Sequence, residues 1–124
     1  MEKVNGIGGF FFAAQDPQLL ADWYCSALGV DRPPESYNTA SWQQLAGSTV
    51  FAPMDADAAI LTAPGAGWSI NFRVDDLDKM VAQLRRLGVQ VDIDPETYPN
   101  GRFASLRDPE GNAIQLWQVA GADA

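Results

Sequence analysis

The sequence predicts an α+β fold: two βαβββ modules form a curved mixed sheet around a concave cavity, with the helices on the outer face. Three observations lead to this class. An Asp-capped helical stretch followed by Leu-Gly-Val occurs twice, ending at residues 30 and 89. Runs in which apolar and polar residues alternate flank the turn sequence at 108–112, which is typical of a β-hairpin. The 124 residues suit one domain, residues 1–124, with modules at about 6–62 and 67–119.

The first module is expected to open with a strand at residues 6–14, which is apolar on both sides near its middle. Asp16 then has the side chain of a helix cap, and Pro17 fits the first helical position because its missing N–H costs nothing there. Gly29 is expected to end this helix in the left-handed conformation. After a loop at 31–40, three short strands are expected, at 41–46, 48–53 and 58–61.

The second module repeats this order after a hinge at residues 62–67, which is rich in Pro and Gly. A strand is expected at 68–74, followed by a helix that Asp76 caps and Gly88 ends. A short strand at 89–93 and a turn-rich loop at 94–100 come next. The closing hairpin pairs 103–107 with 113–119, and residues 120–124 are expected to fray.

Strand alternation predicts which side chains line the cavity. In the strand at 68–74 the apolar set of Ile70, Phe72 and Val74 must face the helix, so the polar set faces the concave side. The same reasoning on the other strands gives a ligand site with apolar walls and a few polar groups. The expected lining residues are Phe11, Trp42, Ser69, Asn71, Arg73, Phe103, Gln115 and Trp117.

Composition excludes several function classes. The net charge of −8 argues against nucleic-acid binding and would favour a cationic ligand over an anionic one. No run is long and apolar enough for a membrane span, and the N-terminus lacks the regions of a signal peptide. One cysteine is typical of a reducing compartment, so a cytoplasmic location is expected. The absence of histidine removes Ser-His and Cys-His nucleophilic pairs and the commonest transition-metal ligand.

Four sequence segments together resemble the vicinal-oxygen-chelate superfamily, which contains the glyoxalase, bleomycin-resistance and extradiol-dioxygenase relatives. They are Phe-Phe-Phe-Ala-Ala-Gln-Asp-Pro at 10–17, Trp-Tyr followed by Leu-Gly-Val within 23–30, Phe-Arg-Val-Asp-Asp-Leu at 72–77 and Asp-Pro-Glu-Gly-Asn-Ala-Ile-Gln-Leu-Trp at 108–117. The resemblance covers almost the whole chain. It implies paired βαβββ modules and a homodimer.

The resemblance also implies where a metal would bind. The ligand positions of metal-dependent members match Gly9, Ser69 and Gln115 here, where relatives carry His or Glu. Glycine has no ligand atom, and neutral hydroxyl and amide oxygens are weak ligands, whereas a tight divalent site needs anionic or imidazole donors. We therefore expect no metal and no cofactor here, whereas the resemblance implies that glyoxalase-type isomerisation and extradiol ring cleavage both depend on that metal.

Three functions fit this reading. The first is a metal-free binding protein that sequesters a hydrophobic or aromatic small molecule. The second is a lyase, isomerase or dioxygenase-like enzyme that uses non-His residues or an unmatched metal site. The third is a regulatory domain whose pocket is filled by its own side chains. Most of the remaining polar residues are read as structural: Asp92, Asp94 and Glu96 as a solvated acidic run, Tyr98 as a turn aromatic, and 108–112 as a turn without chemistry.

Overall fold

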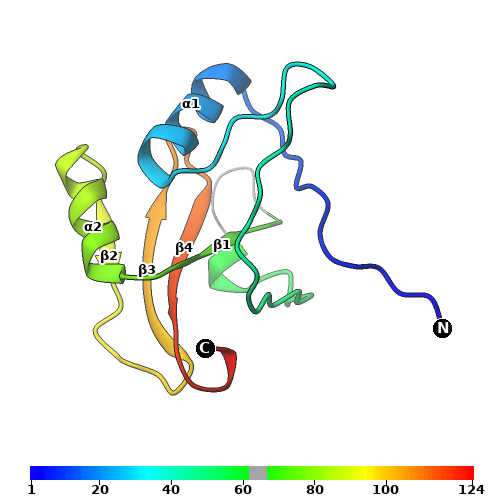
Figure 1. Cartoon of the computed structure of the whole chain (residues 1–124). Coiled ribbons are helices and arrows are strands. Elements are labelled where there is room, and N and C mark those ends of the chain that lie inside the picture. Colours follow the sequence, from blue (N-terminus) through cyan, green and yellow to red (C-terminus); the bar gives the residue numbers. More distant parts are fainter. Residues whose placement is uncertain (62–66) are drawn as a thin grey trace.

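A computed structural model describes residues 1–61 and 67–124 (Figure 1). It contains two α-helices, two short 3-10 helices and one four-stranded sheet within these residues. In chain order the elements are α1 (Pro17–Leu28), η1 (Ala59–Leu61), β1 (Ile70–Val74), α2 (Leu77–Arg86), β2 (Val91–Ile93), β3 (Gly101–Arg107), β4 (Ala113–Val119) and η2 (Gly121–Asp123). The chain is therefore an α+β protein, as the sequence predicts.

Both helices begin at the predicted caps. The Asp16 side chain accepts a hydrogen bond from the backbone N–H of Leu19, and the Asp76 side chain accepts one from Lys79. These bonds satisfy N–H groups that the first helical turn leaves free. Helix α1 ends where predicted, because Gly29 takes the left-handed conformation at φ 74°. Gly88, just after α2, has φ 81°, so this position also favours glycine.

The sheet has the strand order β1-β4-β3-β2. Strands β3 and β4 form the predicted hairpin, with Ala104 opposite Leu116. Strand β1 pairs with β4 in parallel, and β2 pairs with β3 antiparallel. The parallel pairing of β1 with β4 therefore joins the first and last strands of the second half of the chain.

One face of the sheet packs against both helices. Leu77, Leu84 and Leu116 are completely buried, and Ile114 and Val81 are 2% exposed. Phe72 and Val74 pack on this core, as the alternation of the strand predicts. Figure 1 shows α1 and α2 as neighbours beside β3 and β4. The opposite face of the sheet is thus left for the polar side chains.

The turn at 108–112 fastens α1 to the hairpin. Asp108 is buried and accepts four hydrogen bonds: from the Tyr24 hydroxyl and the Asn112 amide on Oδ2, each at 2.7 Å, and from the N–H groups of Glu110 and Asn112 on Oδ1. Burial and the Asp108 carboxylate raise the pKa of Tyr24 above its usual range. The Glu110 carboxylate accepts from the backbone N–H of Gln15 at 2.7 Å. The structural role expected of this turn therefore includes docking a helix from the first half of the chain.

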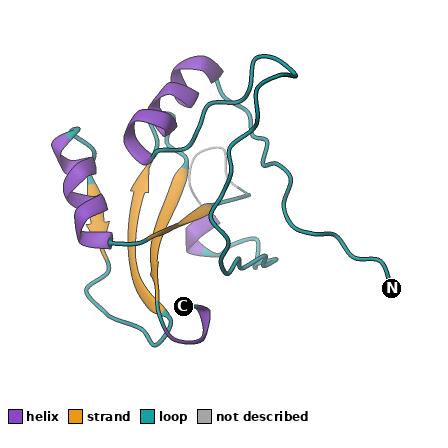
Figure 2. Ribbon diagram, viewed as in Figure 1, coloured by secondary structure: helices purple, strands orange, loops and turns teal. Residues whose placement is uncertain are grey.

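The strands expected in the first module do not form within the single chain. Residues 6–14, 41–46 and 48–53 have no sheet partner in the part of the chain that the structure describes, and residues 59–61 form η1 instead of a strand (Figure 2). A strand needs hydrogen bonds from a neighbouring strand, and β-propensity alone does not supply one. The second half of the chain thus forms a βαβββ module as predicted, whereas the strands predicted for the first module are not formed, and α1 packs on the sheet of the second half.

Smaller differences concern element ends. Strand β1 begins at Ile70 and β2 at Val91, each two residues later than expected, whereas β3 begins two residues earlier, at Gly101. The tail expected to fray contains η2, and Ala120 donates its N–H to the carbonyl of Asn100. Of the hinge expected at 62–67, all but the last residue lies outside the described residues. No helix in the described ranges has the length and hydropathy needed to cross a bilayer.

Candidate functional site

A row of four polar side chains crosses the open face of the sheet. Asn71 on β1 is paired with Gln115 on β4, Gln115 with Ser105 on β3, and Ser105 with Asp92 on β2. Their positions alternate with core residues, so all four point away from the helices. We call these residues the polar row. It spans the whole width of the sheet.

The amide of Gln115 is hydrogen-bonded within the polar row. Its Oε1 accepts a hydrogen bond from Asn71 Nδ2 at 2.7 Å, which leaves its amide N–H groups for other partners. The neighbouring Ser69 hydroxyl donates to the backbone carbonyl of Ala113 at 3.4 Å. The structure thus brings three of the predicted lining residues, Ser69, Asn71 and Gln115, to one part of the sheet.

An aromatic cluster lies two residues along β3 and β4 from the polar row. Phe103 and Trp117 are cross-strand partners whose rings stack with centroids 6.1 Å apart and planes 6° apart. Trp117 is only 4% exposed, and its Nε1 donates to the carbonyl of Asn100 at 2.8 Å. Tyr98 meets Phe103 edge-on at 5.8 Å. Trp117 is therefore the buried member of the cluster, whereas Phe103 is half-buried and Tyr98 is exposed.

The hydroxyl of Tyr98 is also held in place. It donates to Asp94 Oδ2 at 3.0 Å, and this hydrogen bond raises the pKa of Tyr98 to about 12. Tyr98 is therefore more than an aromatic residue in a turn, because its ring and its hydroxyl have defined partners. Asp94 also accepts from the backbone N–H of Glu96, so two members of the expected acidic run organise this loop.

A hollow of about 540 Å³ borders the polar row. Its wall includes Ser69, Gln115, Ser105 and Asp92, together with Arg107 from the end of β3. Arg107 Nη1 donates to the carbonyl of Gly111 at 2.9 Å, so this cation is directed toward the hairpin turn. The volume lies in the range of about 300–1,000 Å³ that small-molecule sites occupy.

Arg73 lies on the same face but is covered by the chain itself. Its Nη2 donates to the carbonyl of Leu45 at 3.0 Å, and a Cβ on Gly47 would collide with its guanidinium. The partner of this cation is thus a backbone carbonyl and not a carboxylate. A second, smaller hollow of about 260 Å³ lies beside Arg73, Asp75 and Gln118.

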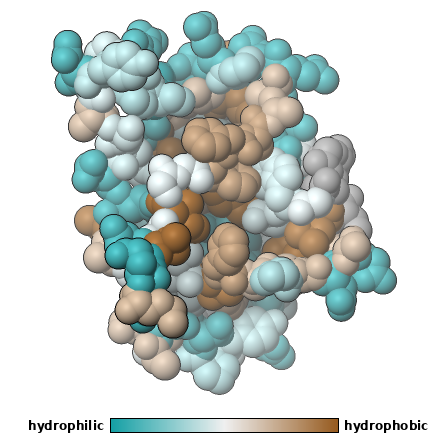
Figure 3. Space-filling view, turned by 90° about the vertical axis from the view of Figure 1, so that its right-hand side faces the viewer, coloured by the Kyte–Doolittle hydropathy of each residue, from teal (hydrophilic) through white to brown (hydrophobic). Residues whose placement is uncertain are grey.

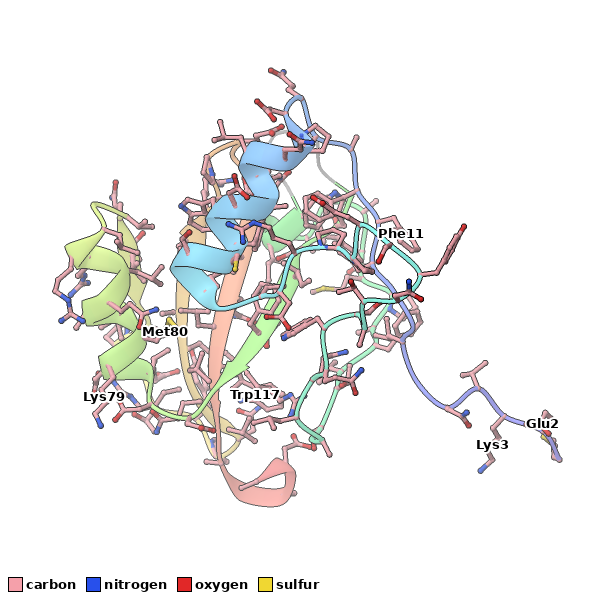
Figure 4. The ribbon with its side chains drawn as sticks, turned by 45° about the horizontal axis from the view of Figure 1, so that its top comes forward. Glu2, Lys3, Phe11, Lys79, Met80 and Trp117 are labelled. Atoms are coloured by element: carbon pink, nitrogen blue, oxygen red, sulfur yellow. The ribbon has the colours of Figure 1, made fainter. Side chains whose placement is uncertain are left out.

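Phe11 and Trp42, the remaining predicted lining residues, are not part of the wall of either hollow. Phe11 is 93% exposed, and Figure 4 shows it well apart from Trp117. Trp42 is 38% exposed. Both belong to segments that have no sheet partner among the described residues, so their place in a ligand site stays a prediction.

Two site residues were missed by the sequence reasoning. Ser105 lies on the face that alternation favours for β3, but it was not carried into the expected site. Asp92 was interpreted as part of a solvated acidic run with Asp94 and Glu96. Its position between the apolar residues Val91 and Ile93 was the available signal, since an isolated charge within a strand points to the open face.

The side chains at the three family metal positions do not fit a divalent ion. Gly9 offers no side-chain donor, and the Ser69 hydroxyl is hydrogen-bonded to a backbone carbonyl. The one amide oxygen of Gln115 already accepts from Asn71. Within residues 1–61 and 67–124, no group of three or more Cys, Asp or Glu side chains could hold a metal ion.

Comparisons with known proteins agree on the fold. A sequence model of the Glyoxalase/Bleomycin resistance protein/Dioxygenase superfamily matches residues 6–116. TnmS3, an antibiotic binding protein from Streptomyces sp. CB03234, is 23% identical, with a TM-score of 0.62 over 97% of this chain and 100% of its own. A protein from Bacillus anthracis assigned to the glyoxalase family is 16% identical, with a TM-score of 0.54 over 94% and 99%.

Curated protein sequences gave no match. At these identities the solved structures support the fold alone, whereas the family model covers most of the chain. Because that match runs from the first extended segment through the polar row to β4, the chain belongs to the Glyoxalase/Bleomycin resistance protein/Dioxygenase superfamily.

Proposed function

We propose that this protein binds a small hydrophobic or aromatic molecule, without a metal, in the hollow beside the polar row. The main support for this proposal is that a hollow of suitable size and polar side chains occur at the same place. A hollow of about 540 Å³ meets hydrogen-bonding side chains whose donor set is unsuited to a divalent ion. TnmS3 is named as an antibiotic binding protein, and this supports binding as a role for the scaffold.

A thermal-stability screen tests this function. We expect planar aromatic compounds to raise the unfolding midpoint, since a ligand at a hundredfold excess over its Kd stabilises the folded state by about 2.7 kcal/mol. Zn²⁺, Ni²⁺, Mn²⁺ and EDTA should leave the midpoint unchanged. Stabilisation by a metal, or destabilisation by EDTA, would show that the protein has a metal site and would contradict the proposal.

We further propose that the protein works as a homodimer. Residues 4–15 and 36–54 contain no charged side chain, although 19% of the chain is charged. These two uncharged segments carry a set of exposed apolar residues: Val4, Ile7, Phe10, Phe11, Leu45, Val50, Phe51 and Met54. Figure 3 shows hydrophobic side chains gathered in the middle of one face of the molecule, with hydrophilic ones around them.

A second copy of the chain is the partner that suits these segments. Depletion of charge is characteristic of the centre of a protein interface, and a large exposed apolar surface is unusual for a monomer. Within the uncharged segments, residues 6–14, 41–46 and 48–53 have no sheet partner among the described residues, and β1 and β2 are the edge strands of the sheet. Two copies would therefore supply hydrogen bonds to each other's unpaired backbone groups. The exposed ring of Phe11 would pack against the second copy.

Sedimentation velocity at micromolar concentration tests the dimer. We expect a species of twice the 13.4 kDa chain mass for the wild type, and a monomer for Phe51→Asp, because a charge in an apolar interface has no partner. Leu87→Asp is the matched control: Leu87 is 56% exposed at the end of α2, outside the uncharged segments, and should leave the mass doubled. A wild-type protein that sediments as a monomer would rule out this assembly.

We also propose that the protein is located in the cytoplasm. The single cysteine, Cys25, has no second cysteine to pair with inside the chain. This supports a reducing compartment and hence a cytoplasmic location.

A further inference from the structure

Three groups of the polar row have hydrogen-bonding capacity that the described chain does not use. Gln115 keeps its amide N–H groups free, because its oxygen is the atom that faces Asn71. The Ser105 hydroxyl and the Asp92 carboxylate have no hydrogen bond to another described residue. The wall of the hollow includes all three. A ligand in the hollow would therefore meet a donor, a hydroxyl and an anion in a fixed order.

The spacing of these groups is set by the sheet. Gln115, Ser105 and Asp92 occupy adjacent strands in register. Neighbouring strands lie about 4.8 Å apart, so the Gln115 and Asp92 positions are separated by roughly 10 Å. A rigid molecule of two fused or linked aromatic rings has about this length. One such molecule could hydrogen-bond to both ends of the row.

No described basic side chain neutralises Asp92. Arg107 is directed to the carbonyl of Gly111, and Arg85 donates to the carbonyl of Val91. The ion pairs between described residues use the carboxylates of Asp22 and Asp78. In a chain of net charge −8, a cation supplied by a ligand is the natural partner for this carboxylate.

We infer that the hollow selects an aromatic amphiphile that carries an oxygen acceptor at one end and a protonated amine at the other. The oxygen acceptor accepts a hydrogen bond from the amide N–H of Gln115, and the ammonium group forms an ion pair with the Asp92 carboxylate. This inference rests on the proposed binding function and specifies its ligand class. The competing account is that Asp92 only blunts the exposed edge of β2, as charged residues on edge strands do.

Calorimetric titration with three matched probes separates these accounts. The first probe is 4-acetyl-4′-(aminomethyl)biphenyl, the second replaces its amine by a hydroxyl, and the third replaces its acetyl group by ethyl. We expect the first probe to bind about tenfold more tightly than either of the others, since a hydrogen bond to a charged group contributes more than a neutral one. Equal affinity of the amine and hydroxyl probes would overturn the inference.

Variants then assign the two ends. Asp92→Asn should remove the preference for the amine, while Gln115→Leu should remove the preference for the acetyl group and leave that for the amine. Glu96→Gln is the control, because it removes the same charge outside the wall of the hollow. A preference for the amine that survives Asp92→Asn would overturn the assignment to Asp92. If none of the three probes binds saturably to the wild type, the proposed function itself fails, and this inference fails with it.

Discussion

Asp108→Ala should unfold more readily than the wild type by about 3 to 5 kcal/mol, because a buried charged group that accepts four hydrogen bonds is lost. The Tyr24 hydroxyl and the Asn112 amide would lose their acceptor inside the protein. The turn would also lose its contact with α1. Since total stabilities lie near 5–15 kcal/mol, this single change should leave little folded protein on mild heating.

Urea denaturation at fixed protein concentration measures this loss. Tyr24→Phe removes one of the four bonds and should cost about 1 kcal/mol. Asp57→Ala is the matched control, since it removes an exposed carboxylate and should change the free energy of unfolding by less than about 0.5 kcal/mol. If Asp108→Ala were as stable as Asp57→Ala, the turn would not be what fastens α1 to the hairpin.

Leu116→Ala is expected to cost about 2 to 5 kcal/mol, because Leu116 is completely buried in β4, between β1 and β3. The loss has two parts, the transfer of the removed methyl groups and the cavity that they leave. The surrounding residues come from both helices and three strands, so little of this cavity can close.

The same urea titration applies, with Leu19→Ala as its control. Leu19 lies on α1 and is 66% exposed, so its truncation removes few contacts and should cost under about 1 kcal/mol. A loss for Leu116→Ala no larger than for Leu19→Ala would contradict the position of the core.

Local signals explain why much of the fold was predictable. Asp16 and Asp76 cap their helices through bonds to residues three positions along, and Gly29 ends α1 through its own backbone conformation. The hairpin of β3 and β4 likewise depends on a short turn sequence. Each of these devices works over a few residues, so the sequence pattern contains the information they need.

The missed features depend on contacts between distant residues. Whether residues 6–14 form a strand depends on a partner for their backbone, and residues 1–61 and 67–124 provide none within the single chain. Whether the Phe11 side chain is exposed or lines the ligand site depends on that strand pairing. Asp92 becomes a site residue only through its register with Ser105 and Gln115, which no local pattern specifies. Alternation along a strand gives the face of a residue, but not its neighbours across the sheet.

Backbone amide NMR in the presence of EDTA tests the central claim most directly. Adding 4-acetyl-4′-(aminomethyl)biphenyl should shift the amide signals of Asp92, Ser105 and Gln115, which lie along the polar row, and leave those on the exposed side of α2 unchanged. Such a result would place the ligand in the hollow without a metal. Saturable shifts confined to other surfaces, or shifts that appear only after a divalent metal is supplied, would contradict a metal-free site at the polar row.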